Sequence, residues 1–321
     1  MTTFVTGASG FLGGHLVAAL LARGDDVRAF VRDSTDAGAL EAQGVEVVRG
    51  ELADPVALAR AAGGCPLVFH LAGIVSHEPS RFAELRSVNV DGIRNLLAAV
   101  EPGARVVHVS SVAAVGPASS PDHPADERQA FPASVARLPY AATKRAGEEV
   151  ALAAAAAGAD VVVANPGFLL GPGDIHRVST WPVGAYLAGD LRFTTTGGLC
   201  FADARDVATG LVTLAERGRR GERTILASTE GNCTWRAFFA RVAAVSGVKR
   251  RMVGLPVWLA VAGATLVRGP VSPDEIRAAG RWWFYDGAKA EHDLDFRPRP
   301  LDETIEDTIA DIRRDLADHS I

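Results

Sequence analysis

Short apolar runs alternate with longer stretches of helical spacing along the first half of the chain. The apolar runs are rich in Val, Leu and Phe at consecutive positions, as expected of strands that helices cover on both faces. They predict strands at 2–6, 26–31, 45–49, 66–71, 104–110 and 160–165. The stretches between them predict helices at 11–23, 54–62, 80–100 and 139–157. This alternation indicates β-α-β units, so we expect an α/β fold with a doubly wound parallel sheet.

The pattern becomes irregular after about residue 165, where Gly and Pro interrupt it repeatedly. Helices are predicted there at 204–217, 234–246, 255–267 and 301–318. We expect residues 1–165 to form the sheet domain and residues 166–321 to form mainly a smaller, irregular α/β lobe, with 203–217 packing back on the sheet domain. A Pro- and Ser-rich loop at 116–138 is predicted to be a functional cover or a surface excursion.

A glycine-rich turn joins the first predicted strand to the first predicted helix. Three of its glycines stand three residues apart, so the backbone can turn tightly and approach a phosphate closely. The helix that follows offers free N–H groups at its N-terminus. Because a dinucleotide-binding motif requires this position, the sequence predicts a Rossmann-type domain. The residues predicted to cradle the dinucleotide are Gly7, Ser9, Gly10, Phe11, Leu12 and Gly13.

The second predicted strand indicates which dinucleotide is bound. Val31 stands at the strand tip, where an acidic residue would bind a ribose 2′-hydroxyl, and Arg32 follows it. A guanidinium can hydrogen-bond a 2′-phosphate, so NADP(H) is favoured over NAD(H). Residues after the third strand are predicted to contact the adenine, and residues after the fourth to let the cofactor pass close to the backbone: Glu51, Leu52, Leu71, Ala72 and Gly73.

A candidate acid/base group lies at the start of the predicted helix 139–157. Tyr140 and Lys144 stand four residues apart, so their side chains share one helix face. A tyrosine has an ordinary pKa of about 10, and a nearby ammonium is expected to lower it toward neutrality. Ser110 and Ser111 follow the fifth strand at the carboxyl edge of the sheet, where ligands of doubly wound folds bind. A hydroxyl there can hold a carbonyl oxygen beside Tyr140.

In order and spacing, these motifs resemble those of the extended short-chain dehydrogenase/reductase superfamily over nearly the whole chain. The resemblance is carried by the glycine turn, Leu71-Ala72-Gly73, Val88-Asn89-Val90-Asp91-Gly92, Ser110-Ser111, Tyr140 with Lys144, and Pro166 with Gly171-Pro172-Gly173-Asp174. Within the superfamily the chain is similar to the dihydroflavonol-reductase-like and 3β-hydroxysteroid-dehydrogenase-like branch, which includes hopanoid-associated sugar epimerase homologues.

The resemblance implies a role for each motif. Tyr140 would be the acid/base, and Lys144 would lower its pKa and hold the nicotinamide ribose. Ser111 would orient the substrate oxygen, and Asn89 would support the helix and a proton relay. Cofactor contacts are expected from Tyr140, Lys144, Pro166 and Phe168.

The chain departs from the superfamily pattern at three places. Many members have Arg-Pro where this chain has Asn165-Pro166, and Asp where it has Glu51. Sugar 4,6-dehydratases have an Asp-Glu pair where this chain has Val112 and Ala113. The eliminating chemistry of those enzymes therefore lacks its acid and base here.

The sequence favours an NAD(P)-dependent oxidoreductase that acts on carbonyl and alcohol groups. The leading hypothesis is a reductase that uses NADPH and a tyrosine proton donor on a ketone or aldehyde of a mainly hydrophobic small molecule. Aromatic residues in the later segments favour such an apolar pocket: Phe168, Trp181, Trp258, Trp282, Trp283 and Phe284. The residues predicted to line the pocket are Val75, His77, Ala113, Phe168 and Trp181.

Two other functions remain open. A nucleotide-sugar epimerase would use Tyr140 and Lys144 with tightly bound NAD, and it would need cations for the diphosphate. Such cations are available at Arg177, Arg192, Arg236, Lys249, Arg250 and Arg251. A non-catalytic, cofactor-sensing protein is the third hypothesis, and the intact set of Ser111, Tyr140 and Lys144 argues against it.

Composition and charge narrow the partners and the compartment. A net charge of −5 over 321 residues gives no basic surface for nucleic acid. No histidine stands at a metal-ligand spacing, so no metal is expected. Cys65, Cys200 and Cys233 are expected to be buried, unpaired thiols of a reducing compartment. The N-terminus has no signal-peptide pattern, so the cytoplasm is the expected location.

One apolar stretch, residues 253–267, is too short and too interrupted to span a membrane. It predicts a core helix of the C-terminal lobe. The alternatives are a wall of the substrate pocket or peripheral contact with a membrane surface, helped by Arg250, Arg251 and Arg268. The superfamily resemblance also allows a homodimer through the helices at 80–100 and 139–157.

Overall fold

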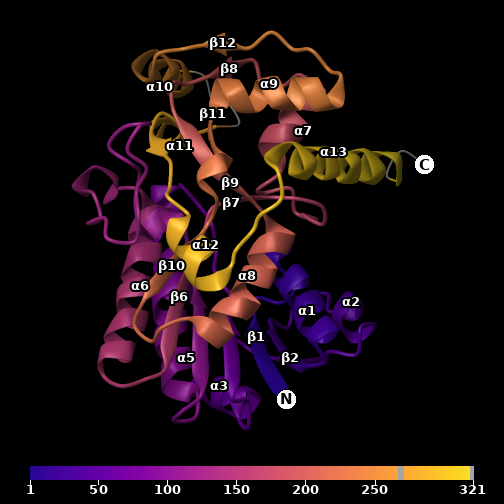
Figure 1. The fold of residues 1–321 in the computed structure, drawn as a ribbon, viewed down its shortest axis with the longest axis vertical. Helices are drawn as coiled ribbons and strands as arrows, with labels where there is room; N and C mark the ends of the chain where they lie inside the picture. The colour runs from indigo at the N-terminus through magenta and orange to yellow at the C-terminus, as the bar shows by residue number, and fades with distance from the viewer. Residues whose placement is uncertain (267–270, 319–321) are drawn as a thin grey trace.

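The computed structural model describes residues 1–266 and 271–318. A parallel sheet of seven strands forms its centre, in the order β10-β6-β5-β4-β1-β2-β3 (Figure 1). These strands are β1 (Thr2–Thr6), β2 (Asp26–Val31), β3 (Glu46–Arg49), β4 (Leu67–His70), β5 (Arg105–Val109), β6 (Val161–Pro166) and β10 (Arg223–Leu226). All neighbouring pairs run parallel, which confirms the predicted doubly wound α/β fold. The strand order reverses between β1 and β4, where such folds bind ligands.

Helices cover both faces of this sheet. One face carries α1 (Phe11–Arg23), α2 (Gly38–Glu41), α8 (Ala204–Arg217) and α12 (Ala288–Leu294). The other face carries α3 (Pro55–Ala62), α5 (Gly92–Ala99) and α6 (Pro139–Ala156). Adjacent residues such as Phe4 and Val5 are buried in opposite layers, which explains why the strands read as continuous apolar runs. Helix α8 packs against α1, and the edge strand β10 also comes from the part of the chain after residue 166.

The predicted helix at 80–100 is interrupted in the structure. It consists of a short 3-10 turn η1 (Pro79–Arg81), helix α4 (Phe82–Arg86), a π-helical turn η2 (Ser87–Asp91) and α5. The backbone of Asn89 in this turn lies so close to Gly147 of α6 that a Cβ on Gly147 would overlap the Asn89 carbonyl oxygen. The side chain of Asn89 is directed to a neighbouring loop. Tertiary contacts therefore set this wider turn, which local spacing does not reveal.

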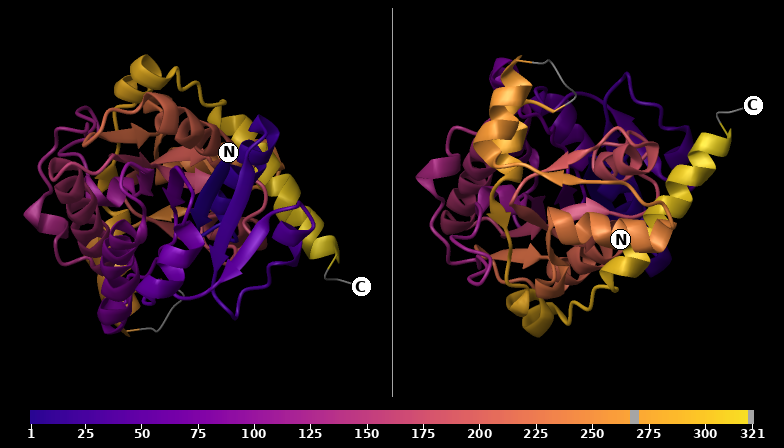
Figure 2. Two further views of the ribbon diagram at one scale, coloured as in Figure 1. Left: turned by 90° about the horizontal axis from the view of Figure 1, so that it is seen from below. Right: turned by 90° about the horizontal axis from the view of Figure 1, so that it is seen from above.

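The second lobe lies above the carboxyl ends of the strands (Figure 1; Figure 2, right). A four-stranded sheet is built from β7 (Phe168–Leu170), β9 (Gly198–Asp203), β11 (Asn232–Thr234) and β13 (Trp282–Trp283), and a small pair from β8 (Phe193–Thr194) and β12 (Val253–Gly254). Its helices are α7 (Trp181–Ala188), α9 (Trp235–Ser246), α10 (Val257–Leu266), α11 (Pro273–Ala279) and α13 (Leu301–Asp318). Short 3-10 turns are η3 (Val112–Ala114), η4 (Ala133–Val135) and η5 (Thr229–Gly231).

The expectation of a core helix at 253–267 is wrong. Helix α10 forms there, but none of its residues is buried, and Trp258 is 72% exposed. The core of this lobe is instead filled by aromatic side chains from α7, α9 and β9. Two of the residues invoked for this stretch, Val267 and Arg268, lie outside the described residues. No helix within the described ranges is long and apolar enough to cross a membrane.

The three cysteines are free and buried, as predicted. Burial raises the pKa of each thiol, and it raises the pKa of Cys200 to about 12. The thiolate is the reactive form, so these side chains act as small apolar groups.

Candidate active site

The glycine turn between β1 and α1 packs closely against neighbouring backbone and leaves the N-terminus of α1 uncapped. Gly7 has a φ of +76°, and a Cβ there would lie 2.6 Å from the backbone nitrogen of Ala72. A Cβ on Gly13 would overlap the carbonyl oxygen of Gly7. No side chain caps the N-terminus of α1, and its first turn contains no acidic residue. Such a cradle of unpaired N–H groups at a helix N-terminus fits the pyrophosphate of a dinucleotide.

Two further segments are held beside this cradle. Thr6 fixes the segment after β4, because its hydroxyl accepts a hydrogen bond from the Ala72 nitrogen (3.3 Å) and its carbonyl accepts one from the Leu71 nitrogen (3.0 Å). His15 of α1 lies 2.9 Å from the carbonyl oxygen of Pro172 and packs edge-on against Phe11. The segment 71–73, predicted to border the cofactor, and the segment 171–174, which carries part of the superfamily resemblance, therefore meet at the glycine turn.

The tip of β2 presents two guanidinium groups. Arg32 is exposed, as its predicted role requires. Arg49, which sequence reasoning missed, donates hydrogen bonds to the carbonyl oxygens of Arg32, Asp33 and Thr35 at 3.0 to 3.2 Å. Its signal in the sequence is its place at the end of β3, in register with Val31. A second positive charge thus stands at the strand tip where a ribose would lie.

Glu51 and Leu52 lie next along this edge. Leu52 is held by α5, since Asn95 donates a hydrogen bond to its carbonyl oxygen (2.9 Å) and its side chain packs on Gly92. Glu51 is exposed. The structure therefore fixes Leu52 firmly and leaves the Glu51 side chain in solvent.

Ser111, Tyr140 and Lys144 meet at the carboxyl end of β5. Ser111 begins the η3 turn, where its hydroxyl accepts a hydrogen bond from the Ala113 nitrogen (3.1 Å). Tyr140 stands in the first turn of α6 and interacts with the Ser111 side chain. Lys144, one helical turn later, is buried and donates a hydrogen bond to the carbonyl oxygen of Val109 (2.9 Å). Gly73 borders the same space, since a Cβ there would lie 3.8 Å from the Lys144 ammonium.

The pKa values of this set differ from the sequence-based expectation. Burial raises the pKa of Tyr140, and its interaction with Ser111 opposes this effect. We expected the Lys144 ammonium to lower the pKa of Tyr140, but burial is the largest influence among the protein's own groups. Burial also lowers the pKa of Lys144 to about 8, while the nearby charge of Glu148 raises it. At neutral pH, Tyr140 is therefore a protonated phenol beside a charged ammonium.

Asn89 braces the loop after β4 against α6. Its side-chain amide donates to the carbonyl oxygen of Ile74 (3.1 Å) and to the hydroxyl of Thr143 (3.2 Å), and it accepts from the Ile74 nitrogen (3.0 Å). The Asn89 oxygen also lies near Gly73, the residue that borders Lys144. Its hydrogen bonds thus tie Thr143 of α6 to the 73–74 loop.

A buried ionic network behind the site was missed by sequence reasoning. Asn165 donates hydrogen bonds to the carbonyl oxygen of Ser111 (2.9 Å) and to the Glu148 carboxylate (2.6 Å). Glu148 is fully buried and pairs with Arg223 of β10 at 3.0 Å. Asn165 takes the place of the arginine found in many superfamily members, and it holds Ser111 by a neutral amide. The only local signal was Glu148, one turn after Lys144 on α6.

Two histidines stack in the core beside Lys144. His70 and His108 are register partners on β4 and β5, with ring centroids 5.6 Å apart. Burial, and then the Lys144 charge, lower the pKa of His70 to about 3 and that of His108 well below its ordinary value. Both imidazoles are therefore uncharged near pH 7.

The residues predicted to line the substrate pocket separate into two groups. Ala113 is buried in an apolar cluster that packs against Tyr140, and the His77 ring lies 6.2 Å from the Tyr140 ring. Val75, two residues before His77, is half exposed. In contrast, Phe168 packs on Phe201 in the core of the second lobe, and Trp181 is exposed at the start of α7. Pro166, at the end of β6, is buried.

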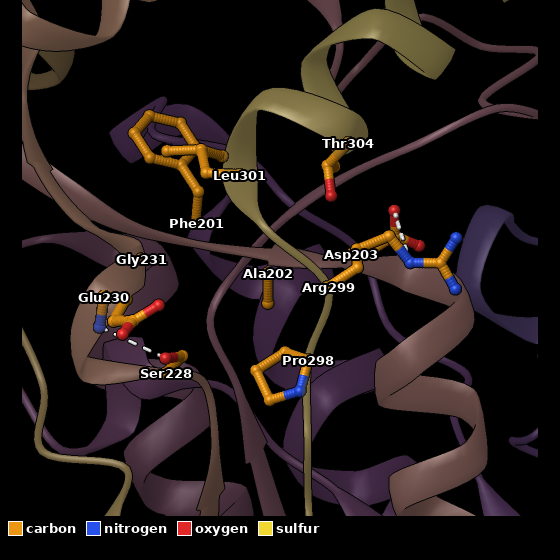
Figure 3. Close-up of a pocket in the computed structure, with 10 residues that line it drawn as sticks. All are labelled: Phe201, Ala202, Asp203, Ser228, Glu230, Gly231, Pro298, Arg299, Leu301 and Thr304. Carbon is orange, nitrogen blue, oxygen red and sulfur yellow. Dashed lines mark hydrogen bonds and ion pairs between the residues drawn. The ribbon is translucent and has the colours of Figure 1, made fainter.

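The surroundings of Tyr140 are mainly apolar. Trp282, Trp283, Phe284 and Tyr285 belong to the same cluster as Ala113, so one aromatic segment that is distant in the sequence packs in this region. By comparison, the cavity in Figure 3 has a volume of only about 30 Å³, enough for a single water. It lies between β9 and the segment 298–304, where Asp203 and Arg299 form an ion pair. That cavity is a packing gap and lies away from the chemistry.

Comparisons with known proteins agree with this geometry. The sequence model of the NAD dependent epimerase/dehydratase family matches residues 3–227. The chain is 33% identical over 274 residues to sterol demethylase protein B of Methylococcus capsulatus, covering 84% of this chain and 82% of that protein. It is 32% identical over 323 residues to a putative dihydroflavonol 4-reductase of Synechocystis, covering 95% and 93% of the two chains.

A solved structure supports the same assignment. A nucleoside-diphosphate-sugar epimerase from Pseudomonas aeruginosa has 28% identity and a TM-score of 0.82, with 98% of each chain covered. The family model reaches all seven strands of the sheet and includes the glycine turn and Tyr140 with Lys144. The chain therefore belongs to the NAD-dependent epimerase/dehydratase family of extended short-chain dehydrogenases/reductases and is an NAD(P)-dependent oxidoreductase.

Proposed function

We propose that this protein is an NADPH-dependent reductase of a ketone or aldehyde on a mainly hydrophobic small molecule, running reversibly as an alcohol dehydrogenase. One observation carries the proposal. Ser111, Tyr140 and Lys144 meet at the carboxyl end of β5 within an apolar, aromatic surround. An apolar site with few polar anchors suits a hydrophobic carbonyl compound.

In the proposed reaction, each group of the site has one task. When bound, the reduced nicotinamide supplies the hydride that the carbonyl carbon accepts. Ser111 holds the carbonyl oxygen, and Tyr140 donates its phenolic proton to that oxygen, so the carbonyl becomes an alcohol. Burial raises the pKa of Tyr140, which keeps this proton in place at neutral pH. Lys144 holds the nicotinamide ribose, and Asn89 keeps α6 and the 73–74 loop in position.

Two of the six cations that could hold a diphosphate, Arg177 and Arg250, already bind groups of the protein, whereas Lys249 and Arg251 have no such bond within the described ranges. A nucleotide sugar would need free cations for its diphosphate. Arg177 is paired with Asp311 and Asp315, each at 2.9 Å, and Arg250 donates to the carbonyl oxygen of Leu187 (2.8 Å). The names of two relatives, sterol demethylase and dihydroflavonol reductase, point to apolar ring compounds as well.

A nucleotide-sugar epimerase with tightly bound NAD is the second candidate. It is supported by the likeness to the Pseudomonas aeruginosa epimerase. Cofactor consumption separates the two, because an epimerase returns its hydride and consumes none. We expect the purified protein to oxidise NADPH with aromatic, steroid, aliphatic or β-keto carbonyl compounds. Conversion of nucleotide sugars without net oxidation would reverse the assignment.

We also propose how the chain divides this work and where it acts. Residues 1–165 hold the cofactor, and residues 166–321 mainly select the substrate. The three buried, free thiols suit a reducing compartment, so we place the enzyme in the cytoplasm. A homodimer through α4, α5 and α6 is the assembly that the superfamily resemblance suggests.

Replacing Arg32 tests the cofactor preference. Arg32→Asp is expected to weaken NADPH binding about thirtyfold, because a charge-assisted hydrogen bond to the 2′-phosphate is lost and a carboxylate repels that group. NADH binding should hold or improve. Arg60→Asp, an equally exposed change on α3, serves as the charge control and should leave both dissociation constants unchanged. Equal affinities of the parent protein for NADPH and NADH would refute the role of Arg32.

The pKa of Lys144 predicts that kcat/KM for NADPH falls at alkaline pH. Its value of about 8 means that the ammonium loses its proton as the pH rises through that region. We expect kcat/KM for NADPH to be level near neutrality and to fall about tenfold per unit above pH 8, since this ratio reports the free enzyme. Tyr140 does not titrate in this range because burial raises its pKa. Glu148→Gln should move this fall to lower pH, because the Glu148 charge raises the pKa of Lys144. A profile level to about pH 9.5 would contradict this.

A further inference from the structure

Helix α10 is apolar on all sides and packs mainly against the short helix α11. Its ten residues contain no charged side chain, and every one of them is at least partly exposed. Trp258 is 72% exposed and Leu259 42%. A helix that is apolar all round normally lies in a core or against another hydrophobic phase. The composition of α10 therefore indicates that it binds another hydrophobic surface.

The apolar surface continues onto the pair of short strands beside α10. Phe193 of β8 and Val253 of β12 are parallel register partners, so their side chains stand on the same face. Both are exposed, at 56% and 40%. The Val253 nitrogen donates a hydrogen bond to the carbonyl oxygen of Arg192 (2.9 Å), which fixes the pair. In Figure 1, α10, β8 and β12 lie together at the end of the molecule farthest from the N-terminus.

Positive charge accompanies this apolar surface. Residues 249–266 contain Lys249, Arg250 and Arg251 and no acidic residue. Arg250 is bound to the carbonyl oxygen of Leu187, whereas Lys249 and Arg251 are exposed and have no hydrogen bond or ion pair within the described ranges. Exposed cations beside Trp and Leu side chains match the interface of an anionic bilayer. If a second copy of the chain docked face to face on this surface, its cations would face these cations and repel them.

Contacts through α11 connect this surface to the candidate active site. Val257, at the start of α10, packs against Gly280 at the end of α11, where a Cβ would overlap the Val257 side chain. The α11 carboxylates of Glu275 and Asp274 act electrostatically on His77. The His77 ring in turn lies 6.2 Å from that of Tyr140. Helix α11 and His77 therefore connect α10 to Tyr140.

We propose that Phe193, Val253, Trp258 and Leu259, with Lys249 and Arg251, form a docking surface for an anionic lipid bilayer. Resting on the proposed function, this docking lets an apolar carbonyl compound dissolved in the bilayer enter the site directly. The protein lies on the membrane without spanning it, with the apolar side chains at the level of the lipid headgroups.

Sedimentation with vesicles tests the docking surface. The parent protein should bind vesicles of phosphatidylcholine with about 30% phosphatidylglycerol, and bind phosphatidylcholine alone weakly. Trp258→Gln with Leu259→Gln should lower the partition coefficient about tenfold, because apolar area is lost. Lys249→Gln with Arg251→Gln should lower it more than tenfold on anionic vesicles only. Val56→Gln, an apolar side chain on α3 that is 77% exposed, is the matched control and should change nothing.

Three outcomes overturn the docking proposal. They are no binding of the parent protein to anionic vesicles, equal binding of parent and the Trp258/Leu259 variant, or a parent dimer that this variant dissociates. Reduction of a small water-soluble ketone, measured in parallel, keeps the two proposals apart. If that ketone is reduced while vesicles are not bound, only the docking proposal fails. If vesicles are bound while no carbonyl compound is reduced, the proposed function fails and the docking surface stands.

Discussion

Tyr140→Phe is expected to lower the turnover of a carbonyl substrate about a thousandfold while NADPH binding stays within about twofold of the parent. The phenylalanine ring keeps the apolar packing against the cluster of Ala113 and Trp283, so the fold is retained. Only the proton that the alkoxide oxygen needs is lost. Single-turnover oxidation of bound NADPH, with a fluorescence titration of NADPH alongside, separates the chemical step from binding.

Tyr186→Phe is the matched control for this substitution. Tyr186 is buried in the second lobe, where its hydroxyl donates to the carbonyl oxygen of Val248 (3.2 Å) and accepts from the Arg250 nitrogen (3.1 Å). Its loss should cost about 1 kcal/mol of stability and leave turnover of a water-soluble ketone unchanged. If Tyr140→Phe reduces the substrate at the parent rate, Tyr140 is not the proton donor.

Gly13→Ala is expected to weaken NADPH binding about a hundredfold and to destabilise the protein by about 2–4 kcal/mol. The added methyl group would overlap the carbonyl oxygen of Gly7 and lie 2.9 Å from the backbone of Ala8, so the turn that cradles the phosphates must move. The backbone of Ala8 cannot move aside as a flexible side chain would, because Ala8 is fully buried. Thermal unfolding and a fluorescence titration of NADPH measure the two effects.

The neighbouring glycine provides the control. Gly14 also lies in α1, but a Cβ there meets nothing within 4 Å. Gly14→Ala should therefore raise stability by about 0.5–1 kcal/mol through helix propensity and leave NADPH binding intact. Equal NADPH affinities of the Gly13→Ala and Gly14→Ala variants would show that the turn does not hold the cofactor.

The pattern of apolar and polar residues along the chain predicted the main strands and helices of the fold with little error. Strands β1 and β2 and helices α1, α8 and α13 have the predicted bounds, because period and punctuation are properties of adjacent residues. Prediction was poorest where distant segments act on one another. The π-helical turn at Asn89 depends on Gly147 and Ile74, and β10 joins the sheet edge only through its pairing with β6.

The candidate site divides in the same way. The glycine turn and the pair of Tyr140 and Lys144 follow from spacing, since residues three or four apart on a helix share a face. Arg49 and the network of Asn165, Glu148 and Arg223 could not be predicted, because their partners are up to 75 residues away in the chain. The prediction of a core helix at 253–267 was also wrong. It rested on hydrophobicity alone, and no residue of α10 is buried.

The sequence by itself determined the fold class and the positions of the glycine turn and of the candidate pair Tyr140 and Lys144, since each depends on short-range spacing. Only the tertiary structure decided the electrostatics of the site. It buries Lys144 and partly buries Tyr140 beside it, so the pKa of the phenol rises and that of the ammonium falls to about 8. It also left every residue of α10 at least partly exposed. Burial depends on which distant segments pack together, and no local pattern contains that information.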